Sequence, residues 1–297
     1  MTAVINVPPS LDDLTFESVL DQLAAHAPDE KVIIDTRHAT FATPFGLAAL
    51  LTLAQTRAEK PEFLTPDDTE VASYWARAGF FRYAEELYTM RGHVPRPRSA
   101  GESDVLLEIT PVTQSDDVHA VVERIQTKAA SIIVNKLHLE SRATMGFAMT
   151  LSEACQNIVE HAGRGGWVMS QTYRYKKRLG GRLVVVIAVC DAGVGFRRSL
   201  ESGQRRPLTD RWDDAVALEA AVVNGVSRHT DAGRGQGLKG IRGYVHRWNG
   251  KLVVRSGTAR IAMLPGWDDD VPRRQDLAPF PGAQMLITIP EKASAVG

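Results

Sequence analysis

Three polar residues, each four positions after the last, lie within the stretch LSEACQNIVEHA, residues 151–162. Four residues slightly exceed one helical turn, so Glu153, Asn157 and His161 would form one stripe along a helix, each turned by roughly 40° from the one before. The apolar residues of the stretch recur at the three- and four-residue spacing of a buried helix face. The polar stripe therefore lies beside the core-facing side of the helix, either as a solvated flank or as one wall of a site.

Two glycine clusters follow this helix, and the first comes at the end of an apolar strand. In DAGVGF, Asp191 precedes Gly193 and Gly195. Glycines spaced by one residue let the backbone turn sharply and let a flat ligand lie close against it. A carboxylate at the strand end can accept a hydrogen bond from an exocyclic amine such as that of adenine.

The second cluster, GRGQGLKGI, stands directly before a helical pattern. Its N–H groups and the N-terminus of that helix would form a cradle for anions such as phosphates. Either cluster alone is more often a turn than a nucleotide loop. The order of the acidic helix, the two glycine clusters and the helix that follows favours a nucleotide site. The candidate residues of the second cluster are Gly233, Arg234, Gly235, Gly237, Leu238 and Lys239.

The elements that would position these residues follow residues 91–103, a Pro-, Gly-, Arg- and Ser-rich stretch that we interpret as a domain boundary. Helices come first and strands come in runs, which predicts an α+β domain with helices on one face of a mixed sheet. The predicted helices are 116–139, 143–162, 213–225 and 236–248, and the predicted strands are 104–112, 166–175, 182–193, 251–257, 259–264 and 283–290.

Residues 104–290 resemble the ATP-binding module shared by gyrase, Hsp90, histidine kinases and MutL, the GHKL or Bergerat-fold ATPases. Three motifs match in order: Glu-x-x-x-Asn-x-x-x-His on the first helix, DAGVG at 191–195 and GRGQGL at 233–238. The resemblance implies that Asn157 binds Mg²⁺, which takes oxygen ligands and completes its shell with phosphate and water. It implies that Glu153 acts as general base or orients the attacking nucleophile.

The same resemblance assigns the two ends of an ATP molecule. Asp191 would bind the adenine amine, with Gly193 and Gly195 lining the pocket, and the glycines of the second cluster would hold the phosphates beneath a lid, residues 196–234. Among the lid arginines Arg234 is the best placed to reach the γ-phosphate, and Lys239 is a comparable candidate. His161 could contact phosphate or serve as a structural histidine at the helix end. The binding residues so implied are Asn157, His161, Asp191, Gly193, Gly195, Gly233, Arg234, Gly235, Gly237, Leu238 and Lys239.

The chain departs from the GHKL pattern just before its last strand. The family often has Gly-Thr there, where this sequence has Gly282 and Ala283. The missing hydroxyl is worth about 1 kcal/mol of hydrogen bonding, so we expect weaker binding rather than none. The loop 265–282 is longer than the module requires, and we expect a tolerated surface insertion.

Residues 1–97 alternate strand and helix patterns, which predicts a small α/β domain. The segment 31–55 resembles the STAS domain of anti-sigma-factor antagonists, in which a strand ending in Asp leads to Asp-Ser-Ser-Gly-Leu. Here residues 43–47 read Thr-Pro-Phe-Gly-Leu, so the phosphoacceptor position is Pro44 and has no hydroxyl. We therefore expect a docking or regulatory element rather than a kinase substrate. Its predicted strands are 3–7 and 31–36, and its predicted helices are 14–26, 44–58 and 70–87.

The composition excludes several classes of protein. Hydrophobic residues at 44% and charged residues at 24% are typical of a soluble globular protein. The net charge of zero gives no electrostatic reason to expect nucleic acid or a membrane as partner. We find no signal-peptide pattern at the start, and the longest apolar run, 183–190, is too short to cross a bilayer. Cys155 and Cys190 lie in apolar patterns and are interpreted as core thiols, so we expect a cytoplasmic protein.

These features predict an ATP-binding regulatory protein that resembles anti-sigma-factor serine/threonine kinases and uses Mg·ATP. It would act on a separate protein, for which a STAS-like or a sigma-factor-like partner is a candidate. His119 lacks the sequence context of a histidine-kinase phosphoacceptor. The alternative is a slow ATPase or a non-kinase switch whose lid ordering controls partner binding. A scaffold that does not bind ATP is the least favoured. The predicted helix 116–139 leaves a homodimer open.

Overall fold

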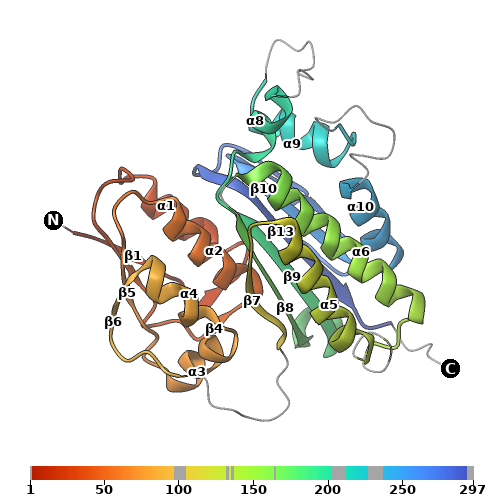
Figure 1. Ribbon diagram of the computed structural model, residues 1–297, viewed down its shortest axis with the longest axis horizontal. Helices are drawn as coiled ribbons and strands as arrows, with labels where there is room; N and C mark the ends of the chain where they lie inside the picture. Colours follow the sequence, from red (N-terminus) through yellow and green to blue (C-terminus); the bar gives the residue numbers. More distant parts are fainter. Residues whose placement is uncertain are drawn as a thin grey trace.

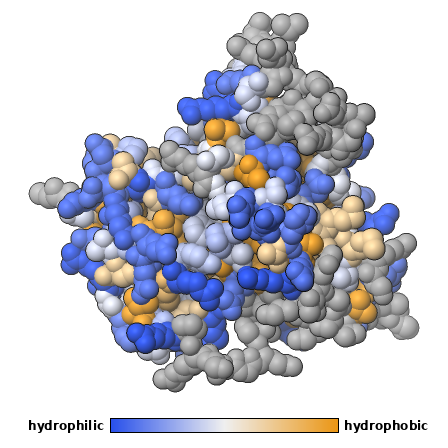
Figure 2. Space-filling model, in the orientation of Figure 1, coloured by the Kyte–Doolittle hydropathy of each residue, from blue (hydrophilic) through white to orange (hydrophobic). Residues whose placement is uncertain are grey.

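The computed structural model describes residues 2–96, 105–131, 134, 137–163, 165–202, 212–226 and 237–292. The fold combines a small parallel sheet, a large antiparallel sheet and helices that pack on both (Figure 1). The described residues contain no helix long and apolar enough to span a membrane. Figure 2 shows one face of the molecule, where polar side chains dominate and apolar areas are small and scattered.

The N-terminal unit, residues 2–96, is built on four strands that pair parallel in the order β1-β3-β5-β6. Parallel neighbours need long crossover connections, and helices supply most of them here. The strands are β1 Ala3–Asn6, β3 Val32–Asp35, β5 Glu62–Leu64 and β6 Thr89–Arg91, with a separate parallel pair β2 Ser10–Leu11 and β4 Phe41–Ala42; the helices are α1 Phe16–Leu23, α2 Pro44–Gln55, α3 Thr69–Arg77 and α4 Phe80–Leu87.

Helix α2 is apolar around almost its whole circumference, and every residue from Pro44 to Ala54 is buried. Its start is specified locally: Pro44 occupies the first turn, and Thr43 Oγ1 accepts a hydrogen bond from the Gly46 N–H at 3.2 Å. A helix that is apolar on all sides must be covered on all sides. The core of the N-terminal unit covers part of α2, and strands of the large sheet cover the rest.

The predicted helix 70–87 is two helices in the structure. Gly79, with φ of 81°, ends the α3 segment and starts α4 in a new direction. The break brings the carbonyl of Ala78 to the outer edge of the large sheet, where it accepts a hydrogen bond from the Ile109 N–H at 2.8 Å. The turn between α3 and α4 therefore covers part of a strand edge that would otherwise be open to pairing.

The large sheet has seven strands in the order β12-β11-β10-β13-β9-β8-β7. We predicted a mixed sheet, but every pair formed by its described strands is antiparallel, and the parallel pairs belong to the N-terminal unit and its separate pair β2–β4. The strands are β7 Val105–Val112, β8 Gly166–Tyr175, β9 Arg182–Asp191, β10 Lys251–Gly257, β11 Ala259–Met263, β12 Arg273–Arg274 and β13 Phe280–Pro290.

Three helices cover one face of the large sheet: α5 Ser115–Ser131, α6 Ser141–Asn157 and α10 Gly237–Arg247 (Figure 1). Helix α6 ends at Asn157, and residues Ile158–Ala162 continue it as a turn of π-helix. The predicted helix 116–139 is too long, because α5 ends at Ser131 and the described residues 137–140 are not helical. Short helices α7 Lys176–Leu179, α8 Gly195–Ser202 and α9 Asp214–Val222 complete the described elements.

The N-terminal unit covers the opposite face of the large sheet, and its helices α1 and α2 lie next to that face (Figure 1). Strand β9 records this two-sided burial: Val184, Val186 and Ala188 face the N-terminal unit, whereas Val185 and Ile187 face the helices. Burial on both faces explains its unbroken apolar sequence. The predicted boundary, residues 91–103, lies mostly outside the described residues, and the cores on its two sides are continuous.

The loop 265–282, which we expected to be a surface insertion, is anchored by buried ion pairs. Asp270 accepts from Arg260 at 2.5 Å and from Lys251 at 3.0 Å, and Lys251 also contacts Asp268. Arg260 in turn contacts Asp13 of the N-terminal unit at 2.7 Å. Buried charges require such partners, so the loop contributes to the contact between the two parts of the chain.

Candidate functional site

Asp191 lies at the end of β9 with a carboxyl group that is almost completely buried, at 7% exposure of the residue. Its Oδ1 accepts a hydrogen bond from the Gly193 N–H at 2.8 Å, and the backbone N–H of Ala283 lies close enough to the same carboxyl group to lower its pKa. Burial disfavours the ionised form and raises the pKa to about 7, although both backbone donors act to lower it. Asp191 is therefore a buried acceptor whose charge changes near neutral pH.

The pair Gly282–Ala283 lies directly against Asp191. Gly282 has φ of 83°, and a Cβ there would overlap the backbone oxygen of Asp191, so a side chain is excluded on both counts. Gln284 holds the turn from the next position, because its Nε2 donates to the carbonyls of Asp191 at 3.1 Å and Pro281 at 2.9 Å. The pair that the sequence matches to the family's Gly-Thr is thus in contact with the candidate base-binding carboxylate.

The turn after Asp191 contacts the end of the helix that carries the polar stripe. A Cβ on Gly193 would overlap the backbone of Ala162, the last residue of the π-helical turn. This close approach joins the first glycine cluster to the helix of Glu153 and Asn157. Two motifs that are about thirty residues apart in the sequence therefore meet at one place.

The other end of the stripe contacts the second glycine cluster. Glu153 is exposed on α6, and its Oε2 lies 2.5 Å from where a Cβ on Gly237, the first residue of α10, would stand. The side-chain amide of Asn157 is partly buried, and its Nδ2 has no hydrogen-bond partner among the described residues. A carboxylate, an unsatisfied amide and a helix N-terminus thus lie on one side of α6.

Some of the other predicted binding residues lie within the described part of the chain, and the rest lie outside it. Leu238 is half-buried and packs on the cores beneath α9 and α10, while Lys239 is exposed on the first turn of α10. His161 belongs to the π-helical turn, but its side chain lies outside the described set, as do residues 233–236, which include Gly233, Arg234 and Gly235.

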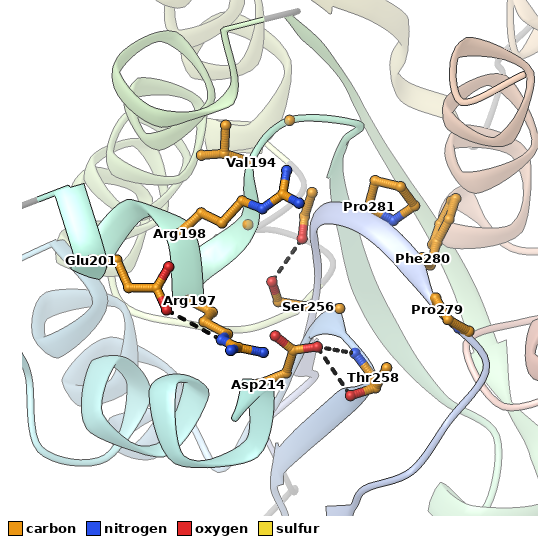
Figure 3. Close-up of a pocket in the computed structure, with 14 residues that line it drawn as sticks. Val194, Arg197, Arg198, Glu201, Asp214, Ser256, Thr258, Pro279, Phe280 and Pro281 are labelled. Carbon is orange, nitrogen blue, oxygen red and sulfur yellow. Dashed lines mark hydrogen bonds and ion pairs between the residues drawn. The ribbon is translucent and has the colours of Figure 1, made fainter. Parts of the chain in front are cut away.

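A pocket of about 410 Å³ adjoins the turn Gly193–Gly195 (Figure 3). Arg198 of α8 extends toward its centre, whereas Arg197 pairs with Glu201 at 3.3 Å and Asp214 accepts from the Thr258 N–H at 2.9 Å. The described residues of the predicted lid, 196–234, comprise α8 from its second residue, a helix that we did not predict, and α9, which we predicted. The pocket is lined by Gly193, Val194, Gly195, Arg197, Arg198, Glu201, Asp214, Ser256, Gly257, Thr258, Pro279, Phe280, Pro281 and Gly282.

Ser256, which we did not predict as a site residue, links the turn at Gly282 to the start of α8. Its Oγ donates to the carbonyl of Gly282 at 2.7 Å (Figure 3). The same Oγ accepts from the Phe196 N–H at 3.1 Å. A single serine within a strand pattern has no sequence signal that distinguishes it, because the role arises only from the two loops that fold onto it.

No family model matches this chain, and no curated protein sequence matches it. A functional proposal therefore rests on the motifs and their geometry. The described residues contain no group of three or more His, Cys, Asp or Glu side chains arranged to hold a metal ion. A cation near Asn157 would need oxygens from its ligand to complete a coordination shell, as Mg²⁺ with phosphates does.

The described arrangement has two chemically different ends. One end offers a buried carboxyl group framed by glycine turns, suited to a flat ring that carries an amine. The other offers the N-terminus of α10 beside Glu153 and Asn157, suited to an anion and its counter-cation. The contact between Gly193 and Ala162 joins the two ends. A molecule with an amine-bearing ring and an anionic tail matches both.

Proposed function

We propose that this chain is an ATP-binding regulatory protein of the GHKL type, with a Bergerat-fold domain over residues 104–290 and a STAS-like N-terminal unit. In this proposal it resembles anti-sigma-factor serine/threonine kinases, binds Mg·ATP and acts on a separate protein. One observation carries the proposal: three motifs spread over about 85 residues of sequence meet along α6 and the π-helical turn that continues it, through Gly193 on Ala162 and Gly237 on Glu153.

The adenine end is proposed to bind at Asp191. An ionised carboxylate accepts hydrogen bonds only, which suits the exocyclic amine of adenine and opposes a carbonyl at the same place. The backbone N–H groups of Gly193 and Ala283 orient the carboxyl group before any ligand arrives. Low exposure strengthens the hydrogen bond and makes its absence costly, so this residue would give the site its preference for adenine.

The phosphate end is proposed to lie between α6 and the start of α10. The Nδ2 of Asn157 is a hydrogen-bond donor without a partner among the described residues, and it would donate to a phosphate oxygen, since buried amides normally have partners. The Oδ1 of the same amide would be the atom that ligates Mg²⁺. Mg²⁺ bound with the nucleotide would neutralise phosphate charge. Glu153, exposed beside Gly237, would accept a proton from an attacking hydroxyl group or orient it.

Ligand-dependent stability tests the proposal, because a ligand that binds only the folded state raises the melting temperature. At Mg·ATP concentrations about 100-fold above Kd, we expect the wild-type chain to gain about 5 °C. Asp191→Asn should lose most of this gain. Asp35→Asn is the matched control, since Asp35 is also a buried aspartate at a strand end but lies in the N-terminal unit. An equal gain in all three proteins would contradict the assignment of Asp191.

A non-kinase switch is the second candidate, and the surroundings of Thr43 favour it. Thr43 is buried, its hydroxyl accepts from Gly46 as the cap of α2, and it donates to the carbonyl of Leu11 at 3.2 Å. The hydroxyl nearest the family's phosphoacceptor position is therefore occupied, and Pro44 has none. The N-terminal unit would then act as a fixed partner of the ATP site rather than as its substrate.

Phosphotransfer from γ-labelled Mg·ATP separates the two candidates. The probe protein is a STAS domain that carries the Asp-Ser-Ser-Gly-Leu sequence. A kinase would label it, and Glu153→Ala should abolish the labelling while ATP still binds. Glu140→Ala, at the start of the same helix, should retain both. Binding without labelling or phosphate release in the wild-type chain would favour the switch, and undiminished labelling by Glu153→Ala would refute the assignment of the base.

A further inference from the structure

The turn that presents Ala283 to Asp191 is fixed by β10 of the large sheet. Ser256 holds the carbonyl of Gly282, and the neighbouring residue on β10, Arg255, holds the chain just before the turn. Arg255 Nη2 donates to the carbonyl of Ala278 at 2.6 Å, and its Nη1 donates to that of Gly257 at 3.0 Å. Arg255 therefore holds the chain five residues before Ala283, while Ser256 and Gln284 hold the turn itself.

Arg255 is itself held by the N-terminal unit. Glu17 of α1 accepts from its Nε at 2.8 Å and from its Nη2 at 3.1 Å, which is the bidentate geometry of strong arginine–carboxylate pairs. Arg255 is 1% exposed. A guanidinium buried to this degree needs its carboxylate, because an uncompensated charge in the interior is strongly unfavourable.

Aromatic packing joins the same parts of the chain. The guanidinium carbon of Arg255 lies 5.6 Å from the ring centre of Phe280, the first residue of β13. The ring of Phe280 lies 5.6 Å from that of Phe16, which is adjacent to Glu17 on α1. Phe280 also lines the pocket beside the turn Gly193–Gly195 (Figure 3). Helix α1 thus contacts the segment before Ala283 through a charge pair and a ring pair.

We propose that Glu17 and Arg255 are a positioning pair for the adenine end of the site. Docking of α1 on the large sheet orients Arg255, Arg255 holds Ala278 and Phe280, and the segment that begins with them keeps the Ala283 N–H beside the carboxyl group of Asp191. Because coupling between two equilibria is reciprocal, bound adenine in turn favours the docked N-terminal unit. The inference deepens the proposed function and rests on it.

The test compares two buried carboxylates of the same interface. Glu17→Gln keeps the shape of the side chain and removes the charge opposite Arg255. Asp13→Asn is the matched control: Asp13 pairs with Arg260, which retains Asp270 and is bonded to no residue of 278–283. Both variants lose one carboxylate between the N-terminal unit and the sheet, but Arg260 keeps Asp270 whereas Arg255 keeps no carboxylate, so Glu17→Gln should lose more stability. Exchange at Gly282 and Ala283 is therefore compared with exchange at Ile187 of β9 in the same protein, which reports the loss of stability alone.

Two readouts separate positioning from stability. The first is hydrogen exchange of the amides of Gly282 and Ala283 without nucleotide, which should become faster in Glu17→Gln and stay unchanged in Asp13→Asn. The second is affinity for Mg·ATP and for Mg·tripolyphosphate, which lacks the base. Loss of one hydrogen bond corresponds to about fivefold, so Glu17→Gln should bind ATP about fivefold more weakly and tripolyphosphate unchanged. Asp13→Asn should match the wild type for both ligands.

The outcomes distinguish this inference from the function on which it rests. If the wild-type chain binds no ATP, the proposed function fails, and the exchange rates still decide whether Glu17 positions the turn. If ATP binds but Glu17→Gln matches Asp13→Asn in both exchange and affinity, the positioning role is refuted and the proposed function stands. Equal weakening of ATP and tripolyphosphate would also refute it, because the effect would not be at the base.

Discussion

At Asp191, burial and hydrogen bonding act on one carboxyl group in opposite directions. Burial is the larger effect and raises the pKa from the model-peptide value near 4 to about 7. The folded state therefore keeps a proton that the unfolded state releases. The stability that this provides is complete below about pH 4 and is lost as pH rises to about 7. The residue thus costs folding energy at neutral pH, a pattern that is common at functional positions.

Nucleotide affinity should depend on pH through this group. The ionised carboxylate is a stronger acceptor for the adenine amine than the protonated group, so bound nucleotide favours loss of the proton. If the carboxyl group is fully ionised in the complex, affinity for Mg·ATP should increase about tenfold between pH 6 and pH 8. Calorimetry in two buffers of different ionisation enthalpy measures both the affinity and the released proton. Asp191→Asn is the control, because any pH dependence that remains in it comes from titration of the nucleotide. If its affinity changes with pH as that of the wild-type chain does, Asp191 is not the acceptor.

Helices α6 and α10 run antiparallel and contact each other at two places that are seven residues apart. Glu153 of α6 contacts Gly237, and Gly146 lies against the ring of Tyr244. Seven residues make about two helical turns, so both contacts are on the same faces of the two helices. The hydroxyl of Tyr244 also donates to the carbonyl of Ala143 at 2.9 Å. The crossing near Gly146 therefore determines where Glu153 lies relative to the start of α10.

Gly146→Ala should destabilise the protein although alanine is the better helix former. A Cβ at Gly146 would stand 2.5 Å from the ring of Tyr244, and such overpacking costs about 1–3 kcal/mol, more than the gain in helix propensity of about 1 kcal/mol. Gly243→Ala on α10 is the control, because a Cβ there meets nothing within 4 Å and should stabilise the fold slightly. Urea unfolding measures both changes. Stabilisation by Gly146→Ala would show that the Tyr244 ring or the two helices can move apart at little cost, which would contradict this prediction.

Several elements were predictable because their signals are local. Strand β9 follows from a continuous apolar run, and the start of α2 follows from Pro44, which suits the first turn of a helix. The break at Gly79 was missed, because a single glycine in a helical pattern is often tolerated. The antiparallel pairing of the large sheet was missed as well, since strand direction is determined by connections and packing rather than by any one strand's sequence.

The candidate site was predictable only in parts. Asp191 and Gly237 stood out because each lies in a motif with a short, distinctive spacing. Glu17 and Arg255 had no such signal, since they are 238 positions apart and an isolated ion pair leaves no local pattern. Their role emerges only where the N-terminal unit docks on the sheet. Residues 233–236 lie outside the described set, so the predictions for Gly233, Arg234 and Gly235 stay predictions.

At the scale of the whole molecule, the N-terminal unit serves as the second layer of the large sheet. Trp167 Nε1 donates to Gln55 Oε1 at 3.0 Å, and the Tyr74 hydroxyl donates to Gln171, so polar contacts surround the shared apolar core. A core that contains residues from Ile5 to Leu286 cannot be divided without exposing apolar surface from both sides. The strand–helix alternation of residues 1–97 suggests a separate domain, but in the structure these residues share one apolar core with the large sheet.

The wholly apolar helix α2 has a consequence for synthesis of the chain. Its covering strands β8, β9 and β13 follow it by more than one hundred to more than two hundred residues. At about 5–20 residues per second, translation of β13 lags behind α2 by roughly ten seconds or more. During that interval the side of α2 that later contacts the large sheet is exposed to solvent even if the N-terminal unit has folded. Binding of a chaperone to this apolar surface would prevent aggregation of the nascent chain.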